Sequence, residues 1–139
     1  MKREQPITAA EWRELDKKAK AKAKREKQKA IDLALKTRFC QTLKDHNIEF
    51  VCEYYFNKQK LYGKEDWHSD YYFPAANLVL ENEGGVWING GHNRGSGFIK
   101  NIDKYNALTM AGIKLLRCIP QTLNSPELLN KIKQLCKQN

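Results

Sequence analysis

The 139-residue chain has no stretch approaching the ~20 consecutive apolar residues of a membrane span, and its basic N-terminus lacks the apolar core of a signal peptide. Cysteine is also scarce, and its four copies show no Cys-x-x-Cys spacing. We predict reduced packing cysteines rather than a zinc site or a disulfide framework. These absences favour a protein with no membrane partner, located in the cytoplasm of a bacterium or a phage-infected host cell.

Acidic residues are outnumbered, because 25 Lys and Arg face 16 Asp and Glu, which gives a net charge of +9. Such an excess suits a polyanionic partner such as nucleic acid. Residues 1–36 alone hold 12 basic and 6 acidic side chains. The length is sufficient for one domain with a core and too short for two ordinary ones. We therefore predict a basic helical arm over 1–36 and one compact domain over 37–139.

The arm has few large apolar residues, and from Ala19 to Lys29 it has none larger than alanine. Thr8 and Glu11 form a capping-box pattern, which predicts a helix that begins just after Thr8. A helix with no face to bury is exposed or partly disordered. It is either a solvated helix that aids solubility or a phosphate-binding arm, and the charge favours the second slightly. The candidate DNA-binding residues of the arm are Lys17, Lys18, Lys20, Lys22, Lys24 and Arg25. Its predicted docking points are Trp12, Leu15, Ile31, Leu33 and Leu35.

Hydrophobic periodicity in the compact part predicts the order α-β-β-β-α-β-α, a mixed α/β (α+β) fold. The expected helices cover 37–47, 97–111 and a segment opening at 125–127, and the expected strands cover 48–56, 67–73, 77–83 and 113–119. Ser96 is the predicted cap of the middle helix and Gly112 its stop. The inner face of this helix is expected to hold Phe98, Ile102, Tyr105 and Leu108. The tyrosines and phenylalanines of the strands are expected to pack rather than to stack on bases.

Acidic residues stand out in the second and third strands, where they are unusual. Asp70 lies in the second strand, and Glu81 and Glu83 end the third, two residues apart and hence on one face. Asp70 and Glu81 can share one or two Mg²⁺ ions, with Mn²⁺ as a substitute, and Glu83 can add a third ligand or a base. The simpler interpretation is that these acids end strands in solvent or pair with Arg94, Lys104 or Arg117.

A glycine-rich segment over 90–97 is expected to be an irregular loop leading into a helix. Such a loop suits a phosphate, although this one is not a Walker A sequence. His92 can act as a general base or remain a loop histidine bonded to backbone. Arg94 can clamp a phosphate. Lys104 can stabilise charge on the attacked phosphorus or form a surface ion pair. His68 shares a strand face with Asp70, so it can join the site or be structural.

Taken together, the runs Asp70-Tyr-Tyr-Phe-Pro, Leu80-Glu-Asn-Glu-Gly-Gly, Gly91-His-Asn-Arg-Gly-Ser-Gly-Phe and Asp103-Lys-Tyr-Asn resemble small phage and prophage nucleases. These belong to the PD-(D/E)xK superfamily, on the side related to the very short patch repair endonucleases. The resemblance covers about 48–119. It implies a restriction-endonuclease-like core, a central mixed sheet flanked by helices, and metal-dependent DNA cleavage.

The resemblance also implies roles for single residues. Asp70 and Glu81 match the metal-binding positions, and Glu53 matches an additional acid. The motif lysine is absent because Glu83 occupies its place, so Lys104 is the candidate replacement, with His92 as its polar partner. A second departure is the run over 66–69, where relatives tend to carry basic residues.

We therefore expect a Mg²⁺-dependent DNA endonuclease, without a small-molecule cofactor, that acts on duplex or branched DNA. The alternatives are a non-catalytic nucleic-acid-binding protein on the same fold and an assembly protein whose basic helix binds a protein. A homodimer would allow paired cuts, although no residue requires one.

Overall fold

The computed structural model describes residues 5–84 and 91–137 and begins with a single long helix, α1 (Ala9–Asp45). Thr8 caps it with the predicted capping box, since its hydroxyl accepts from Glu11 N at 3.2 Å and the Glu11 carboxylate accepts from Thr8 N. The separate helix predicted over 37–47 is wrong, because residues 37–45 are the last turns of α1 and residues 46 and 47 form the turn after it. No glycine or proline interrupts the chain between residues 9 and 45, so nothing local ends the helix earlier.

Four strands form one mixed sheet in the order β1 (Val51–Tyr55), β2 (His68–Phe73), β3 (Leu78–Asn82) and β4 (Lys114–Cys118). β1–β2 and β2–β3 are antiparallel, and β3–β4 is parallel. A short 3₁₀ helix, η1 (Pro74–Ala76), joins β2 to β3. The helices α2 (Gly91–Met110) and α3 (Pro126–Lys137) flank β4 in the chain. From the end of α1 onward the predicted order of helices and strands is therefore confirmed, as is the mixed α/β class.

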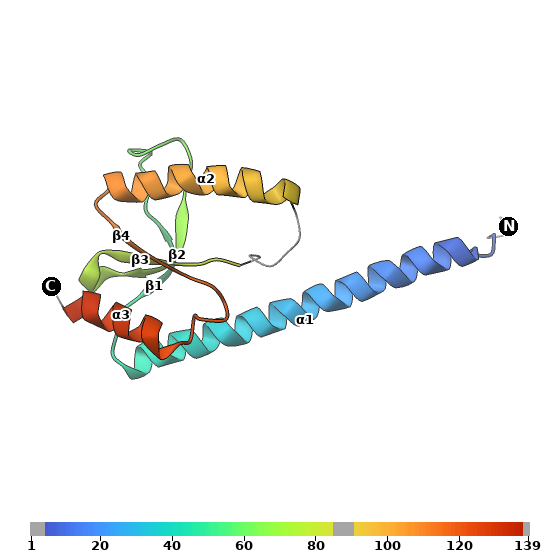
Figure 1. The fold of residues 1–139 in the computed structure, drawn as a ribbon, viewed down its shortest axis with the longest axis horizontal. Helices are drawn as coiled ribbons and strands as arrows, with labels where there is room; N and C mark the ends of the chain where they lie inside the picture. Colours follow the sequence, from blue (N-terminus) through green and yellow to red (C-terminus); the bar gives the residue numbers. More distant parts are fainter. Residues whose placement is uncertain (1–4, 85–90, 138–139) are drawn as a thin grey trace.

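Helices cover both faces of the sheet (Figure 1). The C-terminal end of α1 and all of α3 lie on one face, and α2 lies on the other. The main core lies between the sheet and the first pair of helices, and its buried residues include Phe39, Leu43, Tyr71, Phe73, Leu78, Leu80, Leu128 and Ile132. Because side chains alternate along a strand, the neighbours of Tyr71 and Leu80 project to the opposite face, toward α2.

α2 begins earlier than predicted, since residues 91–96 belong to the helix and not to a loop. Its stop is as predicted: Gly112 has φ +72°, and Ile113 N donates back to Leu108 O at 3.0 Å. Leu108 is buried, but Phe98 and Ile102 are 68% and 43% exposed, so their predicted inner position is wrong. The N-terminal part of α2 extends past the strands, and only its C-terminal part lies over the sheet (Figure 1).

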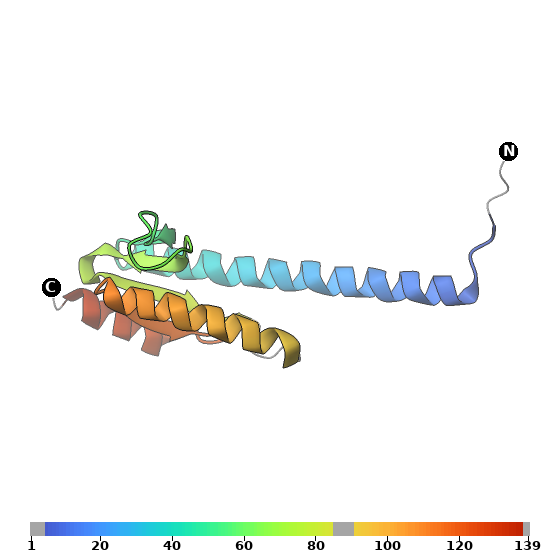
Figure 2. The ribbon, with the colours of Figure 1, turned by 90° about the horizontal axis from the view of Figure 1, so that it is seen from above.

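The first half of α1 projects away from the rest of the protein as a free helix (Figure 2). Its 37 residues correspond to ~55 Å, and all side chains from Ala9 to Ile31 are exposed. Trp12, Leu15, Ile31 and Leu33 are 44–66% exposed, so these predicted docking points make no packing contact with the core, whereas Leu35 does. Among the described helices, none combines the length and the apolar character needed to cross a membrane.

Candidate carboxylate–lysine site

Two of the predicted acids lie on neighbouring strands and face α2. Tyr71 of β2 pairs with Leu80 of β3, so the register places Asp70 and Glu81 at the next opposed positions, whose Cβ atoms lie ~5 Å apart. The Asp70 carboxylate accepts a hydrogen bond from Asn82 N at 2.7 Å, which holds it against the end of β3. The structure thus brings together Asp70 and Glu81, the two residues that the sequence most clearly indicated as metal ligands.

Lys104 reaches Glu81 from α2. Its Nζ lies 2.6 Å from Glu81 Oε1, and the two side chains are only 13% and 10% exposed. The contact is a buried ion pair. Burial raises the pKa of Glu81 above its usual value, and Lys104 opposes this effect without cancelling it. The ionised Glu81 carboxylate is therefore destabilised by burial, and a further cation beside it would reduce that destabilisation.

Glu83 has different partners from Glu81. Arg117 Nε of β4 lies 2.9 Å from Glu83 Oε1, and the Tyr105 hydroxyl also donates to that oxygen. The Arg117 guanidinium lies 4.7 Å from the centre of the Tyr105 ring. Burial and the nearby Glu83 carboxylate raise the pKa of Tyr105. Glu83 thus contacts both Arg117 and Tyr105. From the sequence, Arg117 was one of several possible partners of the acids, and Tyr105 was not among them.

Glu53 lies on β1 opposite Asp70 of β2, because its neighbours Cys52 and Tyr54 pair with Tyr71 and Ser69. Its φ of +51° is in the left-handed region, which costs a non-glycine residue ~1–2 kcal/mol. Its carboxylate turns to His68, whose Nε2 lies 2.9 Å away, so both residues take part in a half-exposed contact beside Asp70. Strained backbone of this kind is concentrated at functional sites.

The carboxylates suit a hard cation only in part. Mg²⁺ commonly binds through one or two carboxylates, with water and phosphate oxygens completing its shell, and Asp70 with Glu81 matches that number. Among the side chains that the structure describes, however, no group of three or more His, Cys, Asp or Glu is arranged to hold a metal. Glu83 as a third ligand stays a prediction, and the observed partners of its carboxylate are Arg117 and Tyr105.

Other predicted residues are less informative. The side chains of His92 and Arg94 lie outside the described residues, as does the segment 85–90. The six basic candidates of the arm are exposed on α1, where Lys18 and Lys20 also approach Glu14 and Asp16 at 3.9 and 2.8 Å. Exposed pairs of this kind contribute little to stability and remain available to phosphates.

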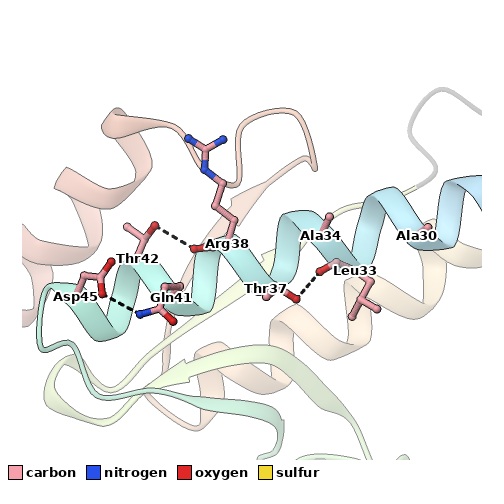
Figure 3. A pocket seen from close by; sticks show the side chains of 8 residues that line it. All are labelled: Ala30, Leu33, Ala34, Thr37, Arg38, Gln41, Thr42 and Asp45. Carbon is pink, nitrogen blue, oxygen red and sulfur yellow. Dashed lines mark hydrogen bonds between the residues drawn. The ribbon is translucent and has the colours of Figure 1, made fainter.

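A cavity of about 730 Å³ lies along the second half of α1, well removed in sequence from the carboxylates (Figure 3). Its lining residues all come from α1, and Thr37 and Thr42 turn their hydroxyls to the backbone at Leu33 and Arg38. This surface is an open helix face with no cluster of catalytic groups.

Comparisons of the chain with models of protein families, with curated proteins and with solved structures gave no match.

Proposed function

We propose that this protein is a metal-dependent DNA endonuclease whose site consists of Asp70, Glu81 and Lys104. The observation that carries the proposal is the buried contact of Lys104 Nζ with Glu81 Oε1 at 2.6 Å, on the face that Asp70 shares. A buried lysine–carboxylate pair is expensive to maintain for stability alone, since its replacement by apolar residues of similar volume often costs nothing. Perturbed groups of this kind are concentrated at catalytic sites.

Each residue has a distinct role in the proposed reaction. Asp70 and Glu81 would hold Mg²⁺, which when bound polarises a phosphate oxygen and lowers the pKa of water. Asn82 N fixes the orientation of the Asp70 carboxylate. Lys104 comes from α2 rather than from β3, and it would stabilise the negative charge that develops on the phosphate as the phosphodiester bond breaks. Glu83 keeps Arg117 in place at the edge of the site.

The exposed half of α1 supplies the proposed DNA contacts. Residues 9–31 extend for ~35 Å, about one turn of a DNA duplex, and carry the six basic candidates along an unobstructed helix. Lysines that neutralise phosphates release counterions, so affinity should fall steeply as salt rises.

The test is a cleavage assay on linear duplex, single-stranded, flap and four-way-junction DNA, in Mg²⁺, Mn²⁺ and EDTA. Asp70→Asn should reduce cutting at least ~100-fold while leaving DNA affinity and the circular dichroism spectrum unchanged. Asp66→Asn is the matched control, because Asp66 is exposed and its contact, to Lys60, is 3.9 Å long. Metal-dependent cutting that survives in Asp70→Asn at full rate would overturn the proposal.

A non-catalytic DNA-binding protein is the second candidate. The observation that favours it is that Glu81 and Glu83 each already have a cationic partner, Lys104 and Arg117. Salt-dependent binding of all four DNA structures, without cutting of any of them in either metal, would establish this alternative.

A further inference from the structure

A second cavity, of about 380 Å³, lies between the end of β1, the segment that follows it and the C-terminal end of α2. Its lining includes Tyr54, Tyr55 and Tyr62, and the last two remain 41% and 36% exposed. Tyr71 and Phe73 are buried as expected for strand aromatics. The aromatic residues of this region therefore divide into a packed set and an exposed set, and the exposed set needs another explanation.

The walls of this cavity are held rigidly. The rings of Tyr54 and Tyr72 are stacked, with centroids 4.0 Å apart and an interplanar angle of 10°. Tyr72 donates its hydroxyl hydrogen to Asn77 Oδ1 at 3.0 Å, and Asn77 Nδ2 donates to Gly112 O at 3.1 Å. These bonds tie the sheet to the end of α2, so one side of the cavity is a fixed aromatic platform.

The opposite side depends on one buried amide. Asn57 is 1% exposed, and its Nδ2 donates to Gly63 O at 3.1 Å and to Glu65 O at 2.7 Å. Its Oδ1 accepts from Tyr62 N at 3.1 Å, which fixes the backbone that carries the Tyr62 ring. An aromatic ring positioned before the ligand arrives loses little entropy on binding.

A cation completes the site. Lys58 Nζ lies 5.4 Å from the centre of the Tyr55 ring. A positive charge beside exposed aromatic faces is the combination used to hold one strand of nucleic acid, since the rings stack on bases and the cation neutralises phosphate. The cavity volume is at the low end of small-molecule sites, which suits a single nucleoside.

The position of the cavity connects it with the carboxylates. Tyr72, whose ring stacks on the cavity-lining Tyr54, is two residues from Asp70 on the same face of β2, a distance of ~7 Å along the strand. We infer that this cavity receives an unpaired nucleobase next to the phosphate that is cut, so that the substrate is DNA with unpaired nucleotides rather than continuous duplex. The inference rests on the proposed nuclease function for the identity of the neighbouring site.

The experiment measures binding in EDTA, where no cutting can interfere. Fluorescence anisotropy compares a continuous duplex with the same duplex carrying one unpaired 2-aminopurine, whose own emission falls when it stacks. The unpaired DNA should bind about tenfold more tightly, with quenched emission. Tyr55→Ala and Tyr62→Ala should each abolish most of that preference, whereas Tyr62→Phe, which retains the ring, should keep it. Both alanine variants replace exposed side chains, and their melting curves verify that the fold is intact.

Equal affinity for both DNAs, or a preference that persists in both alanine variants, would overturn the inference. Cleavage of the same DNAs in Mg²⁺ separates it from the proposed function. A protein that cuts both DNAs equally and shows no binding preference keeps the nuclease function and loses the base site. A protein that cuts neither DNA but shows the tyrosine-dependent preference keeps the base site and loses the nuclease function.

Discussion

Replacement of Lys104 by methionine would leave the Glu81 carboxylate buried without its cation. Methionine preserves most of the volume of the side chain, so packing changes little. Removing one partner of a buried ion pair typically costs 3–5 kcal/mol, and the 10–13% exposure of this pair places it in that class. At pH 8 we expect a loss of about 3 kcal/mol of unfolding free energy, which corresponds to ~10 °C in melting temperature for a protein of this size.

The sign of the pH dependence follows from Glu81. Its pKa in the folded protein is raised, chiefly by burial, even with Lys104 present, and loss of that cation would raise it further. A carboxyl group with a raised folded-state pKa destabilises the fold when ionised, so its penalty is absent below the unfolded-state value and grows as pH rises through the folded-state value. The cost of Lys104→Met should therefore shrink as pH falls from 8 toward ~4.5.

Urea denaturation of four proteins and one control variant between pH 5 and pH 8 measures this effect. They are the wild type, Lys104→Met, Glu81→Gln and the double variant, with Lys100→Met as an exposed control on α2. Glu81→Gln should also lose stability at pH 8, because it leaves the Lys104 ammonium buried without its carboxylate. In the Glu81→Gln background, Lys104→Met should cost less than ~1 kcal/mol. The control should stay within ~0.5 kcal/mol of wild type. A loss of equal size at pH 5 and pH 8, or one that persists in the Gln background, would show that packing and not charge explains it.

Three further outcomes are expected. Adding 10 mM Mg²⁺ should raise the melting temperature of the wild type by a few degrees, as for a site with a Kd of ~1 mM, and Asp70→Asn should show no such rise in the same scan. Gly63→Ala should destabilise the segment after β1, because Gly63 has φ +154° and an added Cβ would lie 2.6 Å from the Trp67 ring. Faster limited proteolysis within 57–67 would detect this loss, and unchanged resistance to the protease would contradict the close approach of Gly63 to Trp67. Deletion of residues 1–30 should leave the melting temperature within ~2 °C of wild type, since this part of α1 makes no core contact, but lower duplex affinity and flatten its salt dependence. A large fall in stability would show that the free helix contributes to the core.

The start of α1, the stop at Gly112 and the element order could be predicted because local chemistry determines them. Thr8 and Glu11 satisfy each other across one helical turn, and Gly112 adopts a conformation that other residues rarely take. Asp70 and Glu81 were found because acids inside apolar strands are rare enough to be informative on their own.

Only the tertiary structure decided which partner each acid has. Lys104 is 23 positions from Glu81 and Arg117 is 34 from Glu83, so no local pattern distinguishes the two pairs. The exposure of Phe98 and Ile102 likewise depends on how far α2 extends beyond the strands, and hydrophobic periodicity gives no information about that extent. The sequence by itself thus determined the start of α1 and the end of α2, since those depend on neighbours within a few residues. The opposition of β2 and β3 and the docking of α2 determined the site, because they alone bring distant charges within contact distance.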